Sequence, residues 1–329
     1  MAWTVYLLRC ADGSLYTGIS REVQRRLRAH NGGRGAAYTR GRRPVTLAYT
    51  EPAADRSAAL RREWAIKQLS HGEKEAMITR RQPPAVGPRA GAGFAGFRPA
   101  ALRFLRELRS RNTRTWFESN RAIYEREVKA PFLALIEDLD VALARTAPEI
   151  VGDPRRSMFR IHRDVRFSRD KSPYKTHAAC WFYHMDAGRG VGSEAEGGAG
   201  FYFQLAPGDC VLGAGVWMPP RGSLAKLRQA LVDDQEGFET IVLGRRLGRR
   251  FGTLDQEAML SRLPRGYSPD HPAARWLRYQ SFTLGRSLSE REAVSPRLRQ
   301  ILARDFAMLT PFVRWLNRAL GFRALDRRV

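Results

Sequence analysis

Residues 5–18 read VYLLRCADGSLYTG, two apolar arms rich in β-branched and aromatic side chains on either side of an Ala-Asp-Gly turn. This pattern predicts a β-hairpin. A three-residue loop over 11–13, with Gly13 in the left-handed conformation, places Tyr6 and Tyr16 on the same face of the hairpin. Two phenols on one face form either an aromatic cross-strand cluster or the floor of a functional site, and the hairpin alone does not decide between them.

A helix is expected directly after the hairpin, over residues 21–30, REVQRRLRAH. Ser20 is placed to cap its first turn, and apolar side chains recur in it at helical spacing. Arg26 and His30 lie one turn apart beside this apolar stripe, so both side chains are expected to border the core.

A second helix is expected to start at Asp55 and to run through DRSAALRREWAIKQLS. Its predicted buried stripe consists of Leu60, Trp64 and Leu69. Glu63 and Lys67 lie one turn apart beside that stripe, which brings one carboxylate inward among cations.

The polar residues of these elements follow one another in the order Val5-Tyr6, Tyr16-Thr17-Gly18, Arg26, His30 and Glu63. This order and spacing resemble the GIY-YIG endonuclease superfamily, and the runs GAAYTRGRRPV and ALRREWAIKQLS resemble its small bacterial single-domain branch. The resemblance covers residues 2–80 and implies an α/β domain with a small antiparallel sheet and helices. Thr4 and Thr17 stand where the motif usually has Gly and Ile.

The resemblance implies a metal-dependent nuclease in which Glu63 is the metal ligand. A lone inward carboxylate suits a hard cation that keeps most of its waters, Mg²⁺ or Mn²⁺. Arg26 offers a permanently charged fork for the scissile phosphate. Tyr6 and Tyr16 are the candidates for the group that positions or deprotonates the attacking water, with Tyr16 favoured and Tyr6 assisting. His30 either orients a tyrosine or contacts phosphate, or it is a hydrogen-bonded structural residue at the helix end.

Further side chains around this site are expected to contact the nucleic acid. They are Lys67, beside the metal-binding carboxylate, and Tyr38, Arg40, Arg42 and Arg43, on the loop before an expected strand PVTLAYT. Cations and an exposed aromatic ring together suit phosphates and bases.

The chain of 329 residues has 57 lysines and arginines against 33 aspartates and glutamates, a formal net charge of +24. Such a charge favours a polyanionic partner. The resemblance implies that this partner is DNA, with branched, nicked and single-stranded forms all open. The three cysteines contain no CxxC pair, so neither a disulfide framework nor a cysteine-rich zinc site is expected, and they fit a reduced cytoplasm. No apolar run reaches membrane-spanning length, and GAGVW at 213–217 is too short for a dinucleotide loop. We therefore expect no membrane and no small-molecule cofactor.

The composition divides the chain into a nuclease domain at 1–80, a flexible linker at 81–96 and a larger domain at 97–329. The linker is rich in Pro, Gly and Ala and offers little to bury. Each flanking part is long enough for a core of its own.

The larger domain reads as helices, then strands, then helices, which indicates an α+β fold. Helical patterns begin at Pro99 and at Asn112, the second with a bend at Pro131. Strands are expected at 157–167, at 176–185 and in a hairpin that turns at Pro207-Gly208-Asp209. Further helices are expected at 221–243, 272–279 and 296–320. Trp217, Trp276 and Trp315 are expected in the core.

The stretch FRIHRDVRFSRDKSPYKTHAACWFY at 159–183 resembles an uncharacterised bacterial family that shares an RDVRFS-DKSPYKT block, a resemblance that covers about 97–320 and implies no activity. Its candidate nucleic-acid-binding cations are Arg160, Arg163, Arg166, Lys171 and Lys175, with Phe167 and Tyr174 between them for base stacking. The alternative is a sheet edge kept soluble by arginine. A metal cluster of His162, Asp164, His177 and His184 is a less favoured interpretation.

The sequence thus favours a metal-dependent endonuclease that hydrolyses DNA phosphodiester bonds in DNA repair or processing, with a C-terminal domain that binds nucleic acid. The alternative is a non-catalytic DNA- or RNA-binding protein that keeps the nuclease fold. Cleavage that depends on a divalent metal distinguishes the two.

Overall fold

A computed structural model describes residues 3–33, 36–80, 93–154, 156–164, 170–187 and 197–325. Its contacts divide the chain into two units, residues 1–92 and 93–329. Most of the expected linker, residues 81–92, lies outside the described residues. Phe94, which we expected within the linker, is buried, and its ring centroid lies 5.1 Å from that of Phe97. The second unit therefore begins no later than Gly93.

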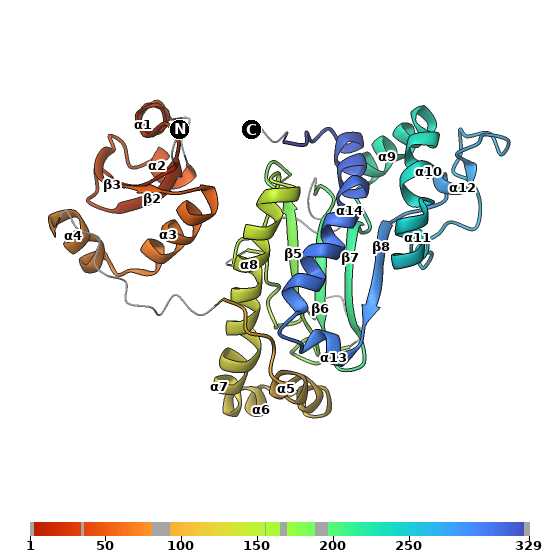
Figure 1. Cartoon of the computed structure of the whole chain (residues 1–329), viewed down its shortest axis with the longest axis horizontal. Helices are drawn as coiled ribbons and strands as arrows, with labels where there is room; N and C mark the ends of the chain where they lie inside the picture. The colour runs from red at the N-terminus through yellow and green to blue at the C-terminus, as the bar shows by residue number, and fades with distance from the viewer. Residues whose placement is uncertain are drawn as a thin grey trace. The chain divides into compact units, whose positions relative to one another are not determined.

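The first unit contains a three-stranded antiparallel sheet in the order β2-β1-β3 (Figure 1). Its strands are β1 (Trp3–Arg9), β2 (Leu15–Ser20) and β3 (Thr46–Ala53). In the turn between β1 and β2, Gly13 has a φ of +78°, and Tyr6 pairs with Gly18 while Tyr16 pairs with Leu8. The predicted three-residue turn and the shared face of the two phenols are therefore confirmed.

The helices described in this unit are α1 (Val23–Asn31), α2 (Ala37–Arg40), α3 (Arg56–Gln68) and α4 (His71–Arg80). The first helix begins two residues later than expected. The Ser20 hydroxyl accepts from the Glu22 N–H at 3.0 Å, which forms a turn before α1 instead of capping it. Asp55 caps α3 as predicted, since its carboxylate accepts from the Ala58 N–H at 2.7 Å.

The face of α3 that meets the sheet differs from our prediction. Ala59 and Ile66 of α3 are fully buried against Val5 and Leu7 of β1, whereas the expected residues Leu60, Trp64 and Leu69 are only half-buried. Glu63, one turn after Ala59, consequently lies at the border of the buried face with a side chain only 14% exposed.

The second unit is built on a five-stranded antiparallel sheet in the order β4-β5-β6-β7-β8. Its strands are β4 (Ile150–Val151), β5 (Ala178–His184), β6 (Gly200–Leu205), β7 (Cys210–Val216) and β8 (Phe282–Leu288). The hairpin of β6 and β7 turns as predicted, with Gly208 at a φ of +75°. The prediction of a strand at 157–167 is wrong for the described residues of this range. They form only the isolated bridges Met158–Cys180 and His162–Tyr174.

Two long helices, α8 (Ala130–Thr146) and α14 (Leu298–Leu320), cross one face of this sheet (Figure 1). Phe132 of α8 lies 5.7 Å from Phe203 of β6 between ring centroids, and Phe306 of α14 stacks 4.7 Å from Phe201. These aromatic rings form the centre of the larger core. Within the described residues, no helix is both long and apolar enough to cross a membrane.

Shorter helices complete the second unit. They are α5 (Pro99–Ser110), α6 (Arg114–Ser119), α7 (Arg121–Ile123), the π-helix η1 (Tyr124–Lys129), α9 (Arg221–Asp233), α10 (Gln235–Val242), α11 (Arg245–Phe251), α12 (Ala274–Leu277) and α13 (Glu290–Ala293). The expected bend at Pro131 takes the form of the π-helical turn before it, and the proline itself occupies the first turn of α8, where its missing N–H is tolerated. Trp276 and Trp315 are buried as predicted, but Trp217 is 57% exposed, so its assignment to the core is wrong.

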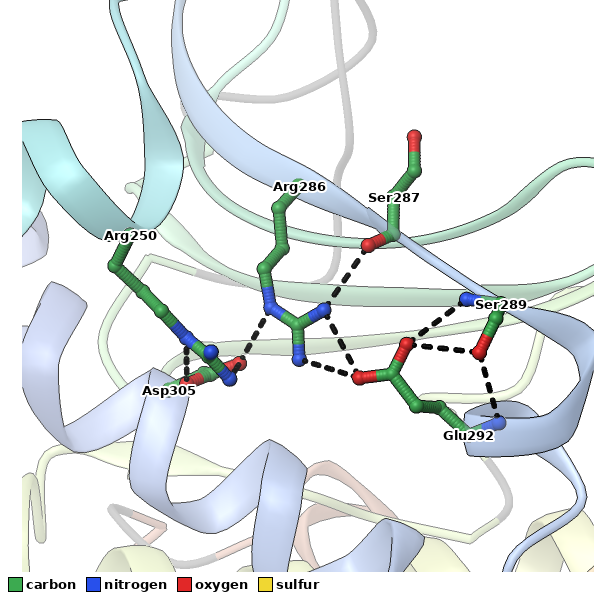
Figure 2. Close-up of polar contacts among 6 residues, drawn as sticks. All are labelled: Arg250, Arg286, Ser287, Ser289, Glu292 and Asp305. Atoms are coloured by element: carbon green, nitrogen blue, oxygen red, sulfur yellow. Dashed lines mark hydrogen bonds and ion pairs between the residues drawn. The ribbon is translucent and has the colours of Figure 1, made fainter.

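A buried carboxylate joins three elements of the second unit (Figure 2). Asp305 of α14 is fully buried and accepts two hydrogen bonds of 3.0 Å from Arg250 of α11 and one of 2.9 Å from Arg286 of β8. Arg286 also reaches Glu292 of α13 at 3.3 Å. One anion between two guanidinium groups thus ties the edge strand to the covering helices.

Candidate functional site

The two tyrosines of the hairpin surround a buried histidine. Tyr6 is 1% exposed and His30 is fully buried, with ring centroids 6.4 Å apart in an edge-to-face contact. The ring centroid of Tyr16 lies 5.1 Å from that of the same imidazole. Tyr38 stacks on Tyr16, with 6.1 Å between the two ring centroids. The sequence-predicted residues Tyr6, Tyr16 and His30 are therefore brought together, and Tyr38 extends the cluster towards solvent.

Glycine at position 18 makes this packing possible. A Cβ atom there would lie 2.6 Å from the hydroxyl oxygen of Tyr6 and 2.7 Å from its Cζ atom. No real Cβ contact is that short, so any side chain at position 18 would displace the Tyr6 ring from its place beside His30.

A chain of hydrogen bonds determines the tautomer of His30. The Thr39 hydroxyl donates to the Ala36 carbonyl at 2.9 Å and lies 2.7 Å from His30 Nδ1. Because its single proton is used on Ala36, the hydroxyl accepts at Nδ1, so Nδ1 carries the proton of the neutral ring. His30 Nε2 is then an acceptor, and the Tyr6 hydroxyl lies 3.4 Å from it.

Burial controls the ionisation of this cluster. It lowers the pKa of His30, and the positive charge of Arg26 lowers it further, so the imidazole is held neutral. Burial, followed by the charge of Tyr16, raises the pKa of Tyr6 to about 12, although contact with Arg26 opposes this. The pKa of Tyr16 is raised by burial and then by Glu63. Arg26 thus acts in the predicted direction on both phenols, but burial outweighs it.

Glu63 lies beside the same cluster, since its charge raises the pKa of both tyrosines. Lys67 donates to its Oε1 at 2.6 Å, while the hydrogen bonds of the described residues leave Oε2 unengaged. No group of three or more His, Cys, Asp or Glu side chains in the described part of the chain could hold a metal ion. A single sheltered carboxylate oxygen fits a cation that takes one protein ligand and keeps its waters.

Tyr38 and Arg40, which were expected on a loop, lie in α2, and the arginines between α2 and β3 are partly used by the fold itself. Arg42 forms an ion pair of 2.8 Å with Asp12 of the hairpin turn and lies over the Tyr38 ring at 4.4 Å. Arg43 donates to the carbonyls of Arg40 and Asn31 at 2.9 and 3.3 Å. Arg40 is exposed. This segment, residues 38–43, therefore presents guanidinium groups and one aromatic ring to solvent while its arginines hold it to the hairpin.

The sequence reasoning missed Thr39, which is buried and fixes the tautomer of His30. Thr39 lies in α2, a helix of four residues, so no apolar period marks its side chain as buried. The only available signal is the run Tyr38-Thr39-Arg40 itself. Its aromatic and charged residues indicate a nucleic-acid contact, and nothing in it indicates a buried hydroxyl.

Burial, and then the nearby charges of Arg160 and Arg163, lower the pKa of Lys175, so three of the candidate cations of the second unit lie close together. Arg163 pairs with Asp170 at 2.7 Å, and Arg166 lies outside the described residues, while Lys171 is exposed. Tyr174 is buried and stacks on Phe117 at 4.1 Å, so the prediction that it stacks on bases is wrong. Its ring lies in the core, where its centroid is also 5.1 Å from that of His162.

The proposed metal cluster of this unit is not supported in its described part, where no such group of ligands occurs. His184 is fully buried, and its Nε2 lies 3.0 Å from the Arg323 carbonyl. His162 packs against the rings of Phe117 and Tyr174. These histidines therefore have structural surroundings.

Comparison with known families matches both units. The family model described as "GIY-YIG catalytic domain" matches residues 2–75, and the model described as "Conserved hypothetical protein (DUF2461)" matches residues 100–315. The resemblance stated from the sequence is confirmed for both parts, as is the fold class. The two matched regions lie within the two units that the contacts define.

Individual relatives cover the first unit. The chain is 56% identical over 74 residues to the UPF0213 protein VNG_2274C of Halobacterium salinarum, which is 22% of this chain and 96% of that protein. It is 44% identical over 93 residues to the UPF0213 protein YhbQ of Escherichia coli, covering 28% of this chain and 83% of that protein. The solution NMR structure of the UPF0213 protein BH0048 from Bacillus halodurans is 42% identical, with a TM-score of 0.18, and covers 26% of this chain and 89% of that one.

Proposed function

We propose that this chain, which belongs to the DUF2461 family of conserved hypothetical proteins, is a metal-dependent endonuclease acting on DNA. The nuclease part is its N-terminal GIY-YIG catalytic domain. The observation that supports this most is that Arg26 and Glu63 lie close enough to the cluster of Tyr6, Tyr16 and His30 for their charges to act on both phenols. A cytoplasmic role in DNA repair or processing fits the three free, buried cysteines and the strongly basic chain.

Phosphodiester hydrolysis needs charge relief at the phosphate, an oriented nucleophile and stabilisation of the leaving oxygen. Glu63 would hold one Mg²⁺ or Mn²⁺ ion through Oε2, and that ion supplies charge stabilisation at the phosphate. Arg26 is exposed and lies near both phenols, so its guanidinium is available to the scissile phosphate. Lys67 and the basic segment with Tyr38, Arg40, Arg42 and Arg43 would hold the flanking strand.

The tyrosines have different roles in this proposal. Tyr16 is half-buried and therefore reachable by substrate, so it positions the attacking water or, once its own phenolic proton has left, deprotonates that water. Tyr6 is almost fully buried and aims its hydroxyl at the neutral Nε2 of His30, so it positions the cluster from behind. A cation held by Glu63 would neutralise the charge of its carboxylate, which is one of the two causes that raise the pKa of Tyr16.

Nicking of supercoiled plasmid by the full-length protein, with Mg²⁺ and with a chelator, tests the proposal. Glu63→Gln is expected to slow nicking at least ~100-fold, as loss of a metal ligand does, while DNA affinity stays within about twofold. Arg26→Ala should reduce both nicking and affinity. Glu22→Gln removes a carboxylate that faces solvent in the same unit and serves as the matched control.

Two outcomes would contradict the assignment. If Glu63→Gln nicks at the parental rate, the metal ligand is misassigned. If the parent protein binds DNA but nicks none of it with Mg²⁺ or Mn²⁺, the chain is a non-catalytic binding protein that keeps the nuclease fold.

A further inference from the structure

A second site lies in the second unit, on the face of the sheet that α8 and α14 leave uncovered. Side chains alternate along a strand, so the neighbours of the buried Phe182, Phe201 and Phe203 point to the opposite face. There a hollow of about 690 Å³ opens over β5 to β8. Its size lies within the range of small-molecule sites. The lining residues that the structure describes all belong to the second unit.

The floor of the hollow lacks side chains at its centre. Gly213 of β7 and Gly285 of β8 are direct cross-strand partners, and both line the hollow. Gly285 needs to be glycine, because a Cβ atom there would lie 2.4 Å from the Leu212 carbonyl oxygen. At Gly213 a Cβ atom would meet nothing closer than 3.4 Å, and no positive φ constrains this residue. Packing within the chain thus does not explain the absence of a side chain at Gly213, which leaves a flat, open floor.

Aromatic rings stand around this floor. Trp181 and Tyr202 are cross-strand partners on β5 and β6, and Trp217 follows the end of β7. Trp217 exposes 57% of its surface, which is unusual for so large an apolar ring. Flat walls and a floor without side chains favour a planar ring as the occupant.

Two polar atoms in residues that line the hollow have no partner. Among the described residues, the buried Nε1 of Trp181 and the buried Oγ1 of Thr283 make no hydrogen bond. Both atoms are shielded from the hollow by neighbouring atoms, so a ligand there contacts them only if the wall shifts. Buried polar atoms without partners are costly.

Cations and carboxylates both line the hollow, and one carboxylate, that of Asp209, lies near His177, where its charge partly offsets the lowering of the His177 pKa by burial. Lys175 is half-buried, and its Nζ atom lies over the Phe159 ring, 5.4 Å from the ring centroid. Within the described residues it forms no ion pair with a carboxylate. His177 lies beside it, two residues further along the chain. Burial and the charges of Arg160 and Arg163 lower the pKa of Lys175, which a bound anion would reverse.

The hollow has two further carboxylates. Asp255 and Glu257 are exposed, line the hollow and follow α11 in a turn in which the Glu257 N–H donates to Asp255 at 2.9 Å. They offer acceptors to hydroxyl or amino groups of an occupant. A ligand for this hollow therefore carries an anion, a planar ring and hydrogen-bond donors.

We propose that this hollow binds a nucleotide. The base lies over Gly213 and Gly285 between the aromatic walls, the phosphate lies at Lys175 and His177, and amino or hydroxyl groups donate to Asp255 and Glu257. The same chemistry is presented by a free mononucleotide and by the 5′-phosphorylated end of single-stranded DNA. The proposal does not depend on nuclease activity in the first unit.

Calorimetric titration of the full-length protein without divalent metal tests this site. We expect saturable binding of dAMP, with deoxyadenosine and inorganic phosphate each at least about tenfold weaker, because each lacks half of the contacts. A 5′-phosphorylated tetranucleotide is titrated beside dAMP. If it binds more tightly than dAMP, the natural ligand is a strand end, and if it binds more weakly, the ligand is a free nucleotide.

Variants separate the two halves of the site. Lys175→Gln should weaken dAMP about tenfold or more and leave deoxyadenosine unchanged, since only dAMP has the phosphate. Gly213→Val should weaken both, because its side chain projects into the floor without a backbone clash. Lys226→Gln, on the exposed surface of α9, and Gly222→Ala, where a Cβ atom meets nothing within 4 Å, are the matched controls.

The outcome that overturns the proposal is plain. Absence of dAMP binding, binding of inorganic phosphate as tight as that of dAMP, or dAMP affinity unchanged by both Lys175→Gln and Gly213→Val would each exclude a nucleotide site in this hollow. Circular dichroism of each variant shows that a lost affinity is not a lost fold.

Discussion

At the scale of single residues, the His30 imidazole links the pH response of the first unit to its chemistry. Burial and Arg26 hold its pKa below the ordinary value of about 6.5. The unfolded chain therefore binds a proton at a higher pH than the folded chain, so this residue contributes stability above pH 6.5 that is lost as the pH falls towards the folded pKa. The same protonation removes the Nε2 acceptor that faces Tyr6.

We therefore expect nicking to slow and the amides of β1 and β2 to lose protection as the pH is lowered below about 6.5. In His30→Gln both pH dependences should flatten in that range, because the side chain no longer titrates. Plasmid nicking and hydrogen exchange, each followed over pH 5 to 8, measure them. A parental pH profile retained in His30→Gln would assign the titration to another group.

Gly18 is the second residue whose role is local and testable. Gly18→Ala forces the Tyr6 ring away from its place beside His30, since the new Cβ atom would lie 2.6 Å from the phenol oxygen. We expect a loss of about 1–3 kcal/mol in unfolding free energy, typical of overpacking, together with slower nicking. Gly72→Ala in α4, where a Cβ atom meets nothing within 4 Å, should leave nicking unchanged and should not lower the unfolding free energy. Urea unfolding and plasmid nicking of the two variants decide whether position 18 needs glycine.

At the scale of elements, the Asp305 carboxylate of Figure 2 determines how α11, α14 and β8 are held together. Asp305→Asn leaves Arg250 and Arg286 without their buried anion. Removing one partner of a buried pair costs about 3–5 kcal/mol, and we expect the lower end because Arg250 is about one-third exposed and can turn to water. Chemical unfolding of the full chain measures the loss, with Asp233→Asn at the exposed end of α9 as the control. A change below ~1 kcal/mol would mean that the packing of α14 alone holds these elements.

The elements that sequence reasoning predicted are those whose signals are local. Gly13 and the alternation around it specify the β1–β2 hairpin, and Asp55 specifies the start of α3. The strand β8, FTLGRSL, escaped prediction because Gly285 interrupts its pattern and Arg286 points to the buried Asp305. A charged residue on the inner face looks like a solvent residue until its partner, far along the chain, is known.

The residues of the candidate site could also be predicted only where the signal was local in the sequence. Glu63 and Arg26 were predicted from their positions beside apolar stripes, although the contact face of α3 is centred on Ala59, which no hydrophobic pattern singles out. Thr39 could not be predicted, since its importance depends on a contact with His30 across two helices. Trp217 was assigned to the core because most tryptophans are buried, and its exposure reflects the open hollow beside it.

At the scale of the whole molecule, the two units have separate cores. The cluster around Val5 and Ile66 belongs to the first unit, and the cluster around Phe203 and Phe306 belongs to the second. A fragment of the second unit should begin at Gly93, not at residue 97 as the composition suggested, because the Phe94 N–H donates to Asp138 of α8 at 2.9 Å and its ring is buried. We expect each unit, cut at this boundary, to fold alone, which circular dichroism of the two fragments tests.

The last prediction concerns the second unit as a partner of DNA. Residues 93–329 contain 40 lysines and arginines against 26 aspartates and glutamates. We expect fragment 93–329 to bind single-stranded DNA with an affinity that falls steeply with salt, because bound phosphates displace counterions. Arg160 and Lys171 are both exposed, whereas Arg163 is held by Asp170, so the double variant Arg160→Gln, Lys171→Gln tests the block without touching that ion pair.

If both cations contact phosphate, the double variant should make the slope of log affinity against log salt less steep by about 1.4. This is about 0.7 for each lost contact to a single strand. The variant Lys226→Gln, which removes an exposed cation from α9, should leave the slope unchanged. Binding isotherms at four salt concentrations measure it. If the fragment binds without salt dependence, or the double variant keeps the parental slope, the block is a solvated surface and the positive charge of this unit serves solubility rather than DNA binding.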